Sequence, residues 1–318
     1  MPPEDLTRVS NLAFGIALGL YLVASVGYFH HLTFRRRRVL TAARVLAYTG
    51  AAVHASSIIA RGVAAGRAPW GNLFEYVTVV GFLIVAAYLV VERRWHTEAV
   101  GGFALGAVVA ALGGATLAYV PPGPLVPALN SYWLLIHVAM ATLASALFAL
   151  GFVFSILYLV QERREKRIAG HVTDTPMRQP ALVAAGAGER PADYVAAGLE
   201  EEESRAPVHP STRSRLPTAS SLDRLAHRVI VFAFPIWTLA VIFGAIWAEE
   251  AWGRYWGWDP KEVWAFITWV VFAGYLHARA TVGWRGKRAA LLAVIGFASL
   301  VFNLTVVNTA IAGLHSYA

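Results

Sequence analysis

The chain has 318 residues, of which 57% are hydrophobic and 14% charged, and its mean hydropathy is positive. Soluble domains carry about a quarter charged residues, so this composition indicates an integral membrane protein. The formal net charge is +8, but the basic residues stand in short clusters between apolar runs, which marks membrane topology and argues against nucleic-acid binding. The sequence contains no cysteine, which excludes disulfides, thiolate metal ligands and thiol chemistry within this chain.

Eight apolar stretches are long enough to cross a bilayer, which takes about 20 helical residues. They lie at residues 11–31, 39–60, 73–91, 99–119, 133–160, 228–248, 262–279 and 289–312. The first stretch is predicted to be a spanning helix and not a signal peptide, because residues 1–5 are acidic and no small-residue cleavage site follows it. We therefore expect an all-α integral membrane protein with about eight transmembrane helices.

The basic clusters predict the orientation of these helices. They comprise Arg35 to Arg38, Arg93 and Arg94, Arg163 to Arg167, Arg224 with Arg228, and Arg279 with Arg285 to Arg288. All of them fall on one side if the helices alternate, and the positive-inside rule makes that side cytoplasmic. Both termini are then extracytoplasmic, as is a tryptophan-rich loop at 247–262. The basic residues left on the outer side are Arg8, Arg61, Arg67, Arg254 and Lys261.

A polar segment divides the chain into three parts. Helices one to five occupy residues 1–160, and helices six to eight with the tryptophan-rich loop occupy 226–318. The intervening residues 161–225 are rich in Ala, Gly, Pro, Ser, Glu and Arg, and they contain too few large apolar side chains to offset the entropy of ordering. We expect a disordered cytoplasmic linker there, with a short helix around 192–203.

The stretch WGRYWGWDPKEVWAF, residues 252–266, raises two alternatives for its aromatic and acidic residues. Asp259 and Glu262 have the spacing of a helix start, with Asp259 as N-cap and Glu262 bonding back, and this alone accounts for the acids. Trp252, Trp256 and Trp258 fit either an interfacial aromatic belt or a platform for a flat apolar ligand with polar edges. The glycines between them favour the platform, because a loop can bring several rings to one spot.

Three histidines fall on the same outer side under this topology: His54, His137 and His315. Each could be a packed or interfacial histidine with a backbone partner. Two imidazoles at matching depth beside a tryptophan loop favour another interpretation, because a histidine pair is a common axial ligand set for haem iron. Arg254 would then lie near the haem propionates.

Several segments also resemble a known family. GAIWAEEAWGRYWGWDPKEVWAFITWVVFAGYLHAR at 244–279 and GLHSYA at 313–318 resemble the CcsA (ResC) component of system II cytochrome c biogenesis, part of the haem-handling family with a tryptophan-rich WWD domain. GRAPWGNLFEY at 66–76 and SYWLLIHV at 131–138 are similar to further family segments.

The resemblance implies a function and a set of site residues. Haem b made in the cytoplasm would pass to the outer face, rest on the WWD loop and be joined by thioether bonds to the CXXCH site of apocytochrome c. His137 and His315 would be its axial ligands, Asp259 would complete the catalytic site, and the three loop tryptophans would form the platform. His54 would bind haem in transit within the membrane.

The resemblance also implies partners and a location. The activity would be that of a cytochrome c haem lyase (holocytochrome c synthase) working with a separate ResB-type subunit, with thioredoxin-like proteins acting indirectly by reducing the acceptor thiols. The protein would lie in the bacterial cytoplasmic membrane, or in the thylakoid membrane of a plastid, with its active site on the extracytoplasmic side. One alternative is a haem exporter or chaperone that leaves ligation to another protein. A b-type electron carrier lacks a transmembrane mate for His54, and no inverted repeats indicate a solute transporter.

Overall fold

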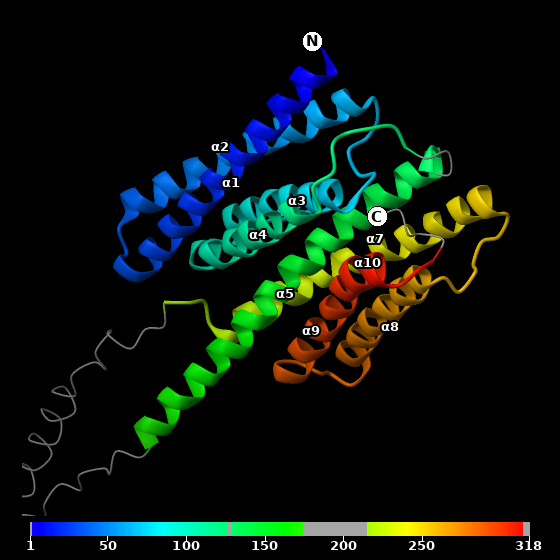
Figure 1. Ribbon diagram of the computed structural model, residues 1–318. Helices are drawn as coiled ribbons and strands as arrows, with labels where there is room; N and C mark the ends of the chain where they lie inside the picture. The colour runs from blue at the N-terminus through cyan, green and yellow to red at the C-terminus, as the bar shows by residue number, and fades with distance from the viewer. Residues whose placement is uncertain (1, 126–128, 174–214, 314–318) are drawn as a thin grey trace, which may run out of the picture. The chain divides into compact units, whose positions relative to one another are not determined.

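The computed structural model describes residues 2–125, 129–173 and 215–313, and the regular structure within these ranges is entirely helical (Figure 1). In chain order the α-helices are α1 (Pro3–Phe34), α2 (Arg37–Ala65), α3 (Leu73–Trp95), α4 (Gly101–Ala115), α5 (Tyr132–Thr173), α7 (Ala219–Trp252), α8 (Pro260–Thr281), α9 (Lys287–Phe302) and α10 (Asn308–Ala310). Two 3-10 turns, η1 (Glu98–Val100) and η2 (Thr116–Ala118), flank α4, and a π-helical turn, η5 (Asn303–Val307), separates α9 from α10. The all-α class expected from the sequence is confirmed.

Seven helical segments in the described ranges are long and apolar enough to cross a membrane. They are α1, α3, α4 with its flanking turns, α5, α7, α8, and α9 with its extension through α10. The eighth expected span falls on α2, which has 29 residues but is more polar than the others. The polarity has a structural reason, because α2 buries His54 and Arg61 against its neighbours instead of facing lipid with them. The protein is a multi-pass helical membrane protein.

The helices reach further than hydropathy predicted. α1 begins at Pro3, α5 continues to Thr173, and α7 begins at Ala219. The 42 residues of α5 correspond to about 63 Å at 1.5 Å per residue, about twice the hydrocarbon thickness. Polar helical turns beyond the bilayer give no apolar signal, so hydropathy does not detect them. The described edges of the 161–225 segment are helical, since they belong to the end of α5 and the start of α7. Residues 174–214, with the short helix expected around 192–203, lie outside the described residues.

Local sequence signals fix the helix ends that border the site. Gly66 caps the end of α2 and Gly253 caps the end of α7, both in the left-handed region with φ of 64° and 70°, where glycine has no steric penalty. α3 begins after Asn72, whose side chain accepts a hydrogen bond from the backbone N–H of Glu75. α8 begins with the predicted capping box of Asp259 and Glu262, which is confirmed.

Two apolar clusters hold residues 1–162 and 216–318 together as one compact unit. The first joins α1 to α5 with the start of α7 and Ala290 of α9, and the second joins α5, α7, α8 and α9. In the second cluster the rings of Phe148 and Phe272 stack at a centroid distance of 3.7 Å. α5 and α7 contribute to both clusters, so they link the two groups of helices. Residues 163–215 form a separate unit, of which the structure describes the end of α5 and Arg215.

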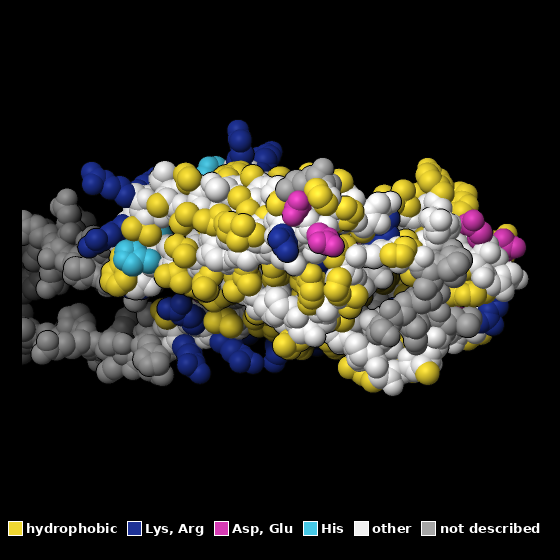
Figure 2. Space-filling model, turned by 45° about the horizontal axis from the view of Figure 1, so that its top comes forward, with side chains coloured by type: hydrophobic (Ala, Val, Ile, Leu, Met, Phe, Trp, Pro, Cys, Tyr) yellow, Lys and Arg dark blue, Asp and Glu magenta, His cyan; other side chains and the backbone are white. Residues whose placement is uncertain are grey.

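Charge is distributed unevenly over the surface. In Figure 2 hydrophobic side chains cover much of the displayed face, and Lys and Arg side chains gather mostly toward the left. This is the end at which α1 stops and α2 begins in Figure 1. The distribution agrees with the alternating helices and basic clusters expected from the sequence.

Candidate functional site

A cavity of about 780 Å³ lies where α2, α4 and α7 end and where α3, α5 and α8 begin. Its walls come from the α2–α3 loop, the segment after α4, the first turns of α5, the last turns of α7, the loop between α7 and α8, and the π-helical turn. The volume lies within the range of about 300–1,000 Å³ that is typical of small-molecule sites. The lining is mainly apolar and aromatic, with a few polar side chains.

His137 lies on the cavity wall, within the first two turns of α5. Its Nδ1 is 2.7 Å from the carbonyl oxygen of Ala240 on α7. A carbonyl oxygen can only accept, so Nδ1 carries the proton and donates it, which leaves Nε2 with a free lone pair in the neutral ring. Gly244 makes this approach possible, because a Cβ added there would lie 2.7 Å from Nδ1.

The tryptophans divide into rings that line the cavity and rings that do not. Trp247, near the end of α7, lines the cavity and lies almost parallel to the His137 ring, at an interplanar angle of 13° and a centroid distance of 6.4 Å. Trp256 lines it from the loop. Trp252 is not among the described lining residues but packs edge-on against Trp247 at 4.8 Å. Trp258 is 71% exposed and also lies outside this lining.

The loop between α7 and α8 is held by one carboxylate. Glu262 accepts hydrogen bonds from the backbone N–H groups of Gly257 at 2.8 Å and Asp259 at 3.1 Å. Trp258, between them, has φ of 57°, in the left-handed region that non-glycine residues rarely occupy. The contacts of Glu262 on both sides therefore stabilise an unfavourable backbone conformation that turns the Trp258 ring outward.

Asp259 is buried, with 7% of its surface exposed, and it lies against the C-terminal segment. A Cβ added at Gly313 would lie 2.6 Å from Asp259 Oδ2, so the two residues are in close contact and a larger residue at 313 would require the Asp259 side chain to shift. His315, which the sequence predicts as a ligand, lies outside the described residues. The contact at Gly313 brings the chain to the loop two residues before His315.

His54 is buried apart from this cavity, since it is not among the described residues that line it. Its Nδ1 is 3.3 Å from the hydroxyl of Tyr21, and the rings of Phe14 and Phe82 pack edge-on against the imidazole. Its Nε2 has no hydrogen-bond partner among the described residues. A fully buried nitrogen without a partner is uncommon and calls for an explanation.

Arg254 does not lie on the described cavity wall. Its side chain is exposed and its guanidinium covers the backbone of Gly257, because a Cβ added at Gly257 would collide with it. The contact with propionates expected from the sequence therefore stays a prediction.

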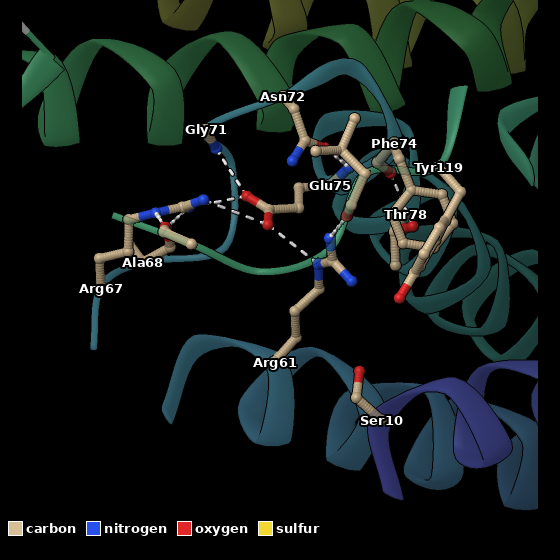
Figure 3. A network of polar contacts seen from close by, with 12 residues as sticks. Ser10, Arg61, Arg67, Ala68, Gly71, Asn72, Phe74, Glu75, Thr78 and Tyr119 are labelled. Carbon is tan, nitrogen blue, oxygen red and sulfur yellow. Dashed lines mark hydrogen bonds and ion pairs between the residues drawn. The ribbon is translucent and has the colours of Figure 1, made fainter. Parts of the chain in front are cut away.

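A network of charged side chains borders the cavity at the α2–α3 loop (Figure 3). Glu75, on α3, is fully buried and binds Arg61 Nε at 2.9 Å and Arg67 Nη1 at 2.7 Å. Both arginines also donate to the segment after α4, Arg61 to the carbonyl oxygen of Val120 and Arg67 to that of Gly123. The network thus joins α2, α3 and this segment.

Sequence reasoning missed several residues of the cavity wall. Trp247 was not assigned to the platform, and Arg67, Trp70, Lys261 and Asn303 were given no role. Four of them carried a usable signal, because Arg67 and Trp70 stand in the quoted segment 66–76, and Trp247 and Lys261 stand in the quoted segment 244–279. Asn303 stands in neither segment, and its place on the wall depends on how the helices pack, which local sequence does not reveal.

The fold and this cavity define the class: a multi-pass helical membrane protein with a tryptophan-lined cavity and a histidine on its wall. A sequence model described as "Cytochrome C assembly protein" matches residues 70–315. The chain belongs to this family.

Individual relatives agree with the family assignment. The chain is 35% identical to a "Cytochrome c biogenesis protein CcsA" of Synechococcus sp. (strain JA-3-3Ab), over 97% of this chain and 94% of that protein. It is 33% identical to the protein of the same name from Gloeobacter violaceus, over 100% of this chain and 98% of that protein. It is also 33% identical to the protein of that name from Porphyra purpurea, over 98% of this chain and 98% of that protein. Among solved structures, "Cytochrome c Heme Lyase CcmF" is similar with a TM-score of 0.63 at 17% identity, over 98% of this chain and 49% of that chain, which shows a shared fold.

Proposed function

We propose that this protein is the haem-handling subunit of a cytochrome c synthase and that the cavity holds haem while it is attached to apocytochrome c. The observation that supports this most is His137, whose Nδ1–H is bound to a backbone carbonyl on the wall of a tryptophan-lined cavity. That hydrogen bond fixes the tautomer in which Nε2 can bind iron. The family assignment and the names of the relatives point to the same role.

Haem is here a substrate, with His137 and His315 as its two axial ligands. Gly313, at the start of the motif GLHSYA, contacts Asp259, so the C-terminal segment approaches the loop that ends at α8. Trp247 and Trp256 offer flat apolar surfaces to the macrocycle. Bis-histidine ligation and exclusion of water both tune the iron potential.

The proposed chemical step is the addition of two cysteine thiols of a CXXCH segment across the two haem vinyl groups. Each addition forms one C–S and one C–H bond and breaks one S–H bond and one C=C π bond, so it needs no net oxidant or reductant. The protein contributes orientation, because each vinyl group must meet its intended thiol. The CXXCH histidine then displaces one axial ligand and releases the product.

Haem reaches the outer site through the membrane, and His54 is the proposed ligand in transit. Its buried Nε2 without a partner among the described residues is consistent with a ligand position. The packed rings of Phe14 and Phe82 must move to admit haem. The second transit ligand comes from a ResB-type subunit, and the cavity faces the extracytoplasmic side.

Co-expression with a ResB-type subunit and an apocytochrome c tests this proposal. His137→Ala is expected to abolish haem attachment to the CXXCH segment, measured by haem stain after denaturing electrophoresis. Exposed His277→Ala, at the other end of α8, is the matched control and is expected to retain attachment. Normal attachment by His137→Ala would reject the assignment.

A haem exporter or chaperone is the second candidate, because the same cavity serves delivery without ligation. This alternative predicts that haem bound by the purified protein stays unattached when a reduced CXXCH peptide is added to the complex. Formation of the thioether product favours the synthase.

A further inference from the structure

We infer that Arg67 binds a propionate carboxylate of haem in the cavity, a role that rests on the proposed function. A haem propionate is an anion, and an anion entering a cavity of low polarity needs a positive partner. The charged side chains among the described lining residues are Arg67, Lys261 and Glu262. Glu262 is occupied by the backbone of the loop, and Lys261 has Asp259 as a nearby counter-charge.

The charges around Arg67 do not cancel. Arg61 and Arg67 contribute two positive charges and Glu75 one negative charge, so the network carries a net charge of +1. Glu75 has no capacity left to compensate, because it already accepts from Arg61, from both terminal nitrogens of Arg67, and from the backbone N–H of Gly71. An uncompensated charge in a buried network is costly, and a second carboxylate would offset that cost.

Arg67 also has donor capacity that this network does not use. Its Nε donates to Gly123, and its Nη1 donates to Ala68 and Glu75. Its Nη2 makes one long contact of 3.3 Å with Glu75, which leaves one of the five guanidinium hydrogens without an acceptor among the described residues. Arg67 lines the cavity, whereas Arg61 does not, so Arg67 is the member of the network that a ligand can reach.

The network also gives Arg67 a defined position. Gly71 packs against the guanidinium, since a Cβ added at Gly71 would lie 2.8 Å from Cζ and Nη1 of Arg67. Together with the carbonyl groups of Ala68 and Gly123, this contact holds the planar group in one orientation. Such preorganisation suits an arginine that recognises a carboxylate.

A comparison of two ligands tests the inference: haem and haem dimethyl ester, whose propionates carry no charge. Both are titrated into the full-length protein in detergent, and binding is followed in the Soret band. We expect the wild type to bind haem roughly ten- to hundredfold more tightly than the ester, which is the ratio of affinities that one charge-assisted hydrogen bond provides. Arg67→Gln is expected to lose this preference by weakening haem binding and leaving the ester unaffected.

The variants are chosen so that they remain folded. Arg67→Gln leaves Arg61 and Glu75 as a neutral pair, and Arg67→Lys serves if the glutamine variant fails to fold. The lysine keeps the charge but cannot donate as a fork, so its preference should fall without vanishing. Exposed Arg8→Gln, on α1, is the control and should keep the full preference.

Each other outcome overturns the inference. Equal weakening of haem and ester by Arg67→Gln would show that Arg67 only supports the cavity wall. The same holds if the wild type shows no preference, or if Lys261→Gln or Arg254→Gln removes the preference while Arg67→Gln keeps it. Binding that His137→Ala leaves unchanged would reject the proposed function itself, whereas His137-dependent binding with an intact preference in Arg67→Gln rejects only this inference.

Discussion

At His137 a single hydrogen bond decides which ring nitrogen can reach a ligand. Ala240 holds the proton on Nδ1, and Gly244, one helical turn further along α7, leaves room for the ring. The sequence placed His137 near the outer end of α5 but could not show this arrangement, because it depends on a contact between residues 103 positions apart. The histidine was predictable, and its tautomer was not.

Substitution at Gly244 is expected to disturb the site without replacing any proposed ligand. The Cβ of Gly244→Ala would lie 2.7 Å from His137 Nδ1, so the ring must shift and the bond to Ala240 must lengthen. We expect a severalfold loss of bound haem, measured by pyridine haemochrome in the purified protein. Gly274→Ala is the matched control, because nothing lies within 4 Å of its added Cβ. Equal haem content in both variants would contradict this account of Gly244.

Glu262 is expected to stabilise the loop through its two accepted hydrogen bonds. Glu262→Ala removes both and should cost about 0.5–2 kcal/mol, the usual range for a helix cap. Glu262→Gln keeps a side-chain oxygen that can accept, so its loss should be smaller. Thermal unfolding of the two variants measures the difference, and a glutamine variant as unstable as the alanine variant would contradict the role of this acceptor.

Helices were the part of the structure most visible in the sequence. Long apolar runs predicted all seven described segments that are long and apolar enough to cross a membrane, and the Asp259 capping box predicted where α8 begins. Hydropathy failed at the polar ends of α5 and α7, which are helical without being apolar. It also gave no sign of the network between α2 and α3, because Arg61, Arg67 and Glu75 meet only after the chain turns at Gly66.

The start of α7 and the end of α8 lie away from the cavity, and a substitution there is predicted to change stability without changing ligand binding. Asp223 on α7 binds Arg279 on α8 through two hydrogen bonds of 2.8 and 3.0 Å, and it accepts from the backbone N–H of Gly286. Asp223→Ala should lower the free energy of unfolding by about 1.5–3 kcal/mol, because it leaves a partly buried arginine without its partner. The haem spectrum should stay unchanged. A spectral change with normal stability would contradict this separation.

For the whole molecule, the absence of cysteine from the sequence makes the topology directly measurable. Exposed Tyr255 lies in the loop before α8, and exposed Val282 follows its other end. If the cavity faces the extracytoplasmic side, a membrane-impermeant maleimide should label Tyr255→Cys in intact spheroplasts. Val282→Cys should react only after the membrane is opened. The reverse pattern would invert the topology expected from the basic clusters.

The central claim is that the cavity binds haem through His137, and the absorption spectrum of a rescued variant tests it most directly. The reduced wild type, purified from haem-replete cells with its ResB-type partner, should show a bis-histidine spectrum. His137→Gly should lose that spectrum, and added imidazole should restore it by occupying the vacated position. A bis-histidine spectrum that persists in His137→Gly without imidazole, while His54→Gly abolishes it, would contradict the claim and assign the bound haem to the membrane interior.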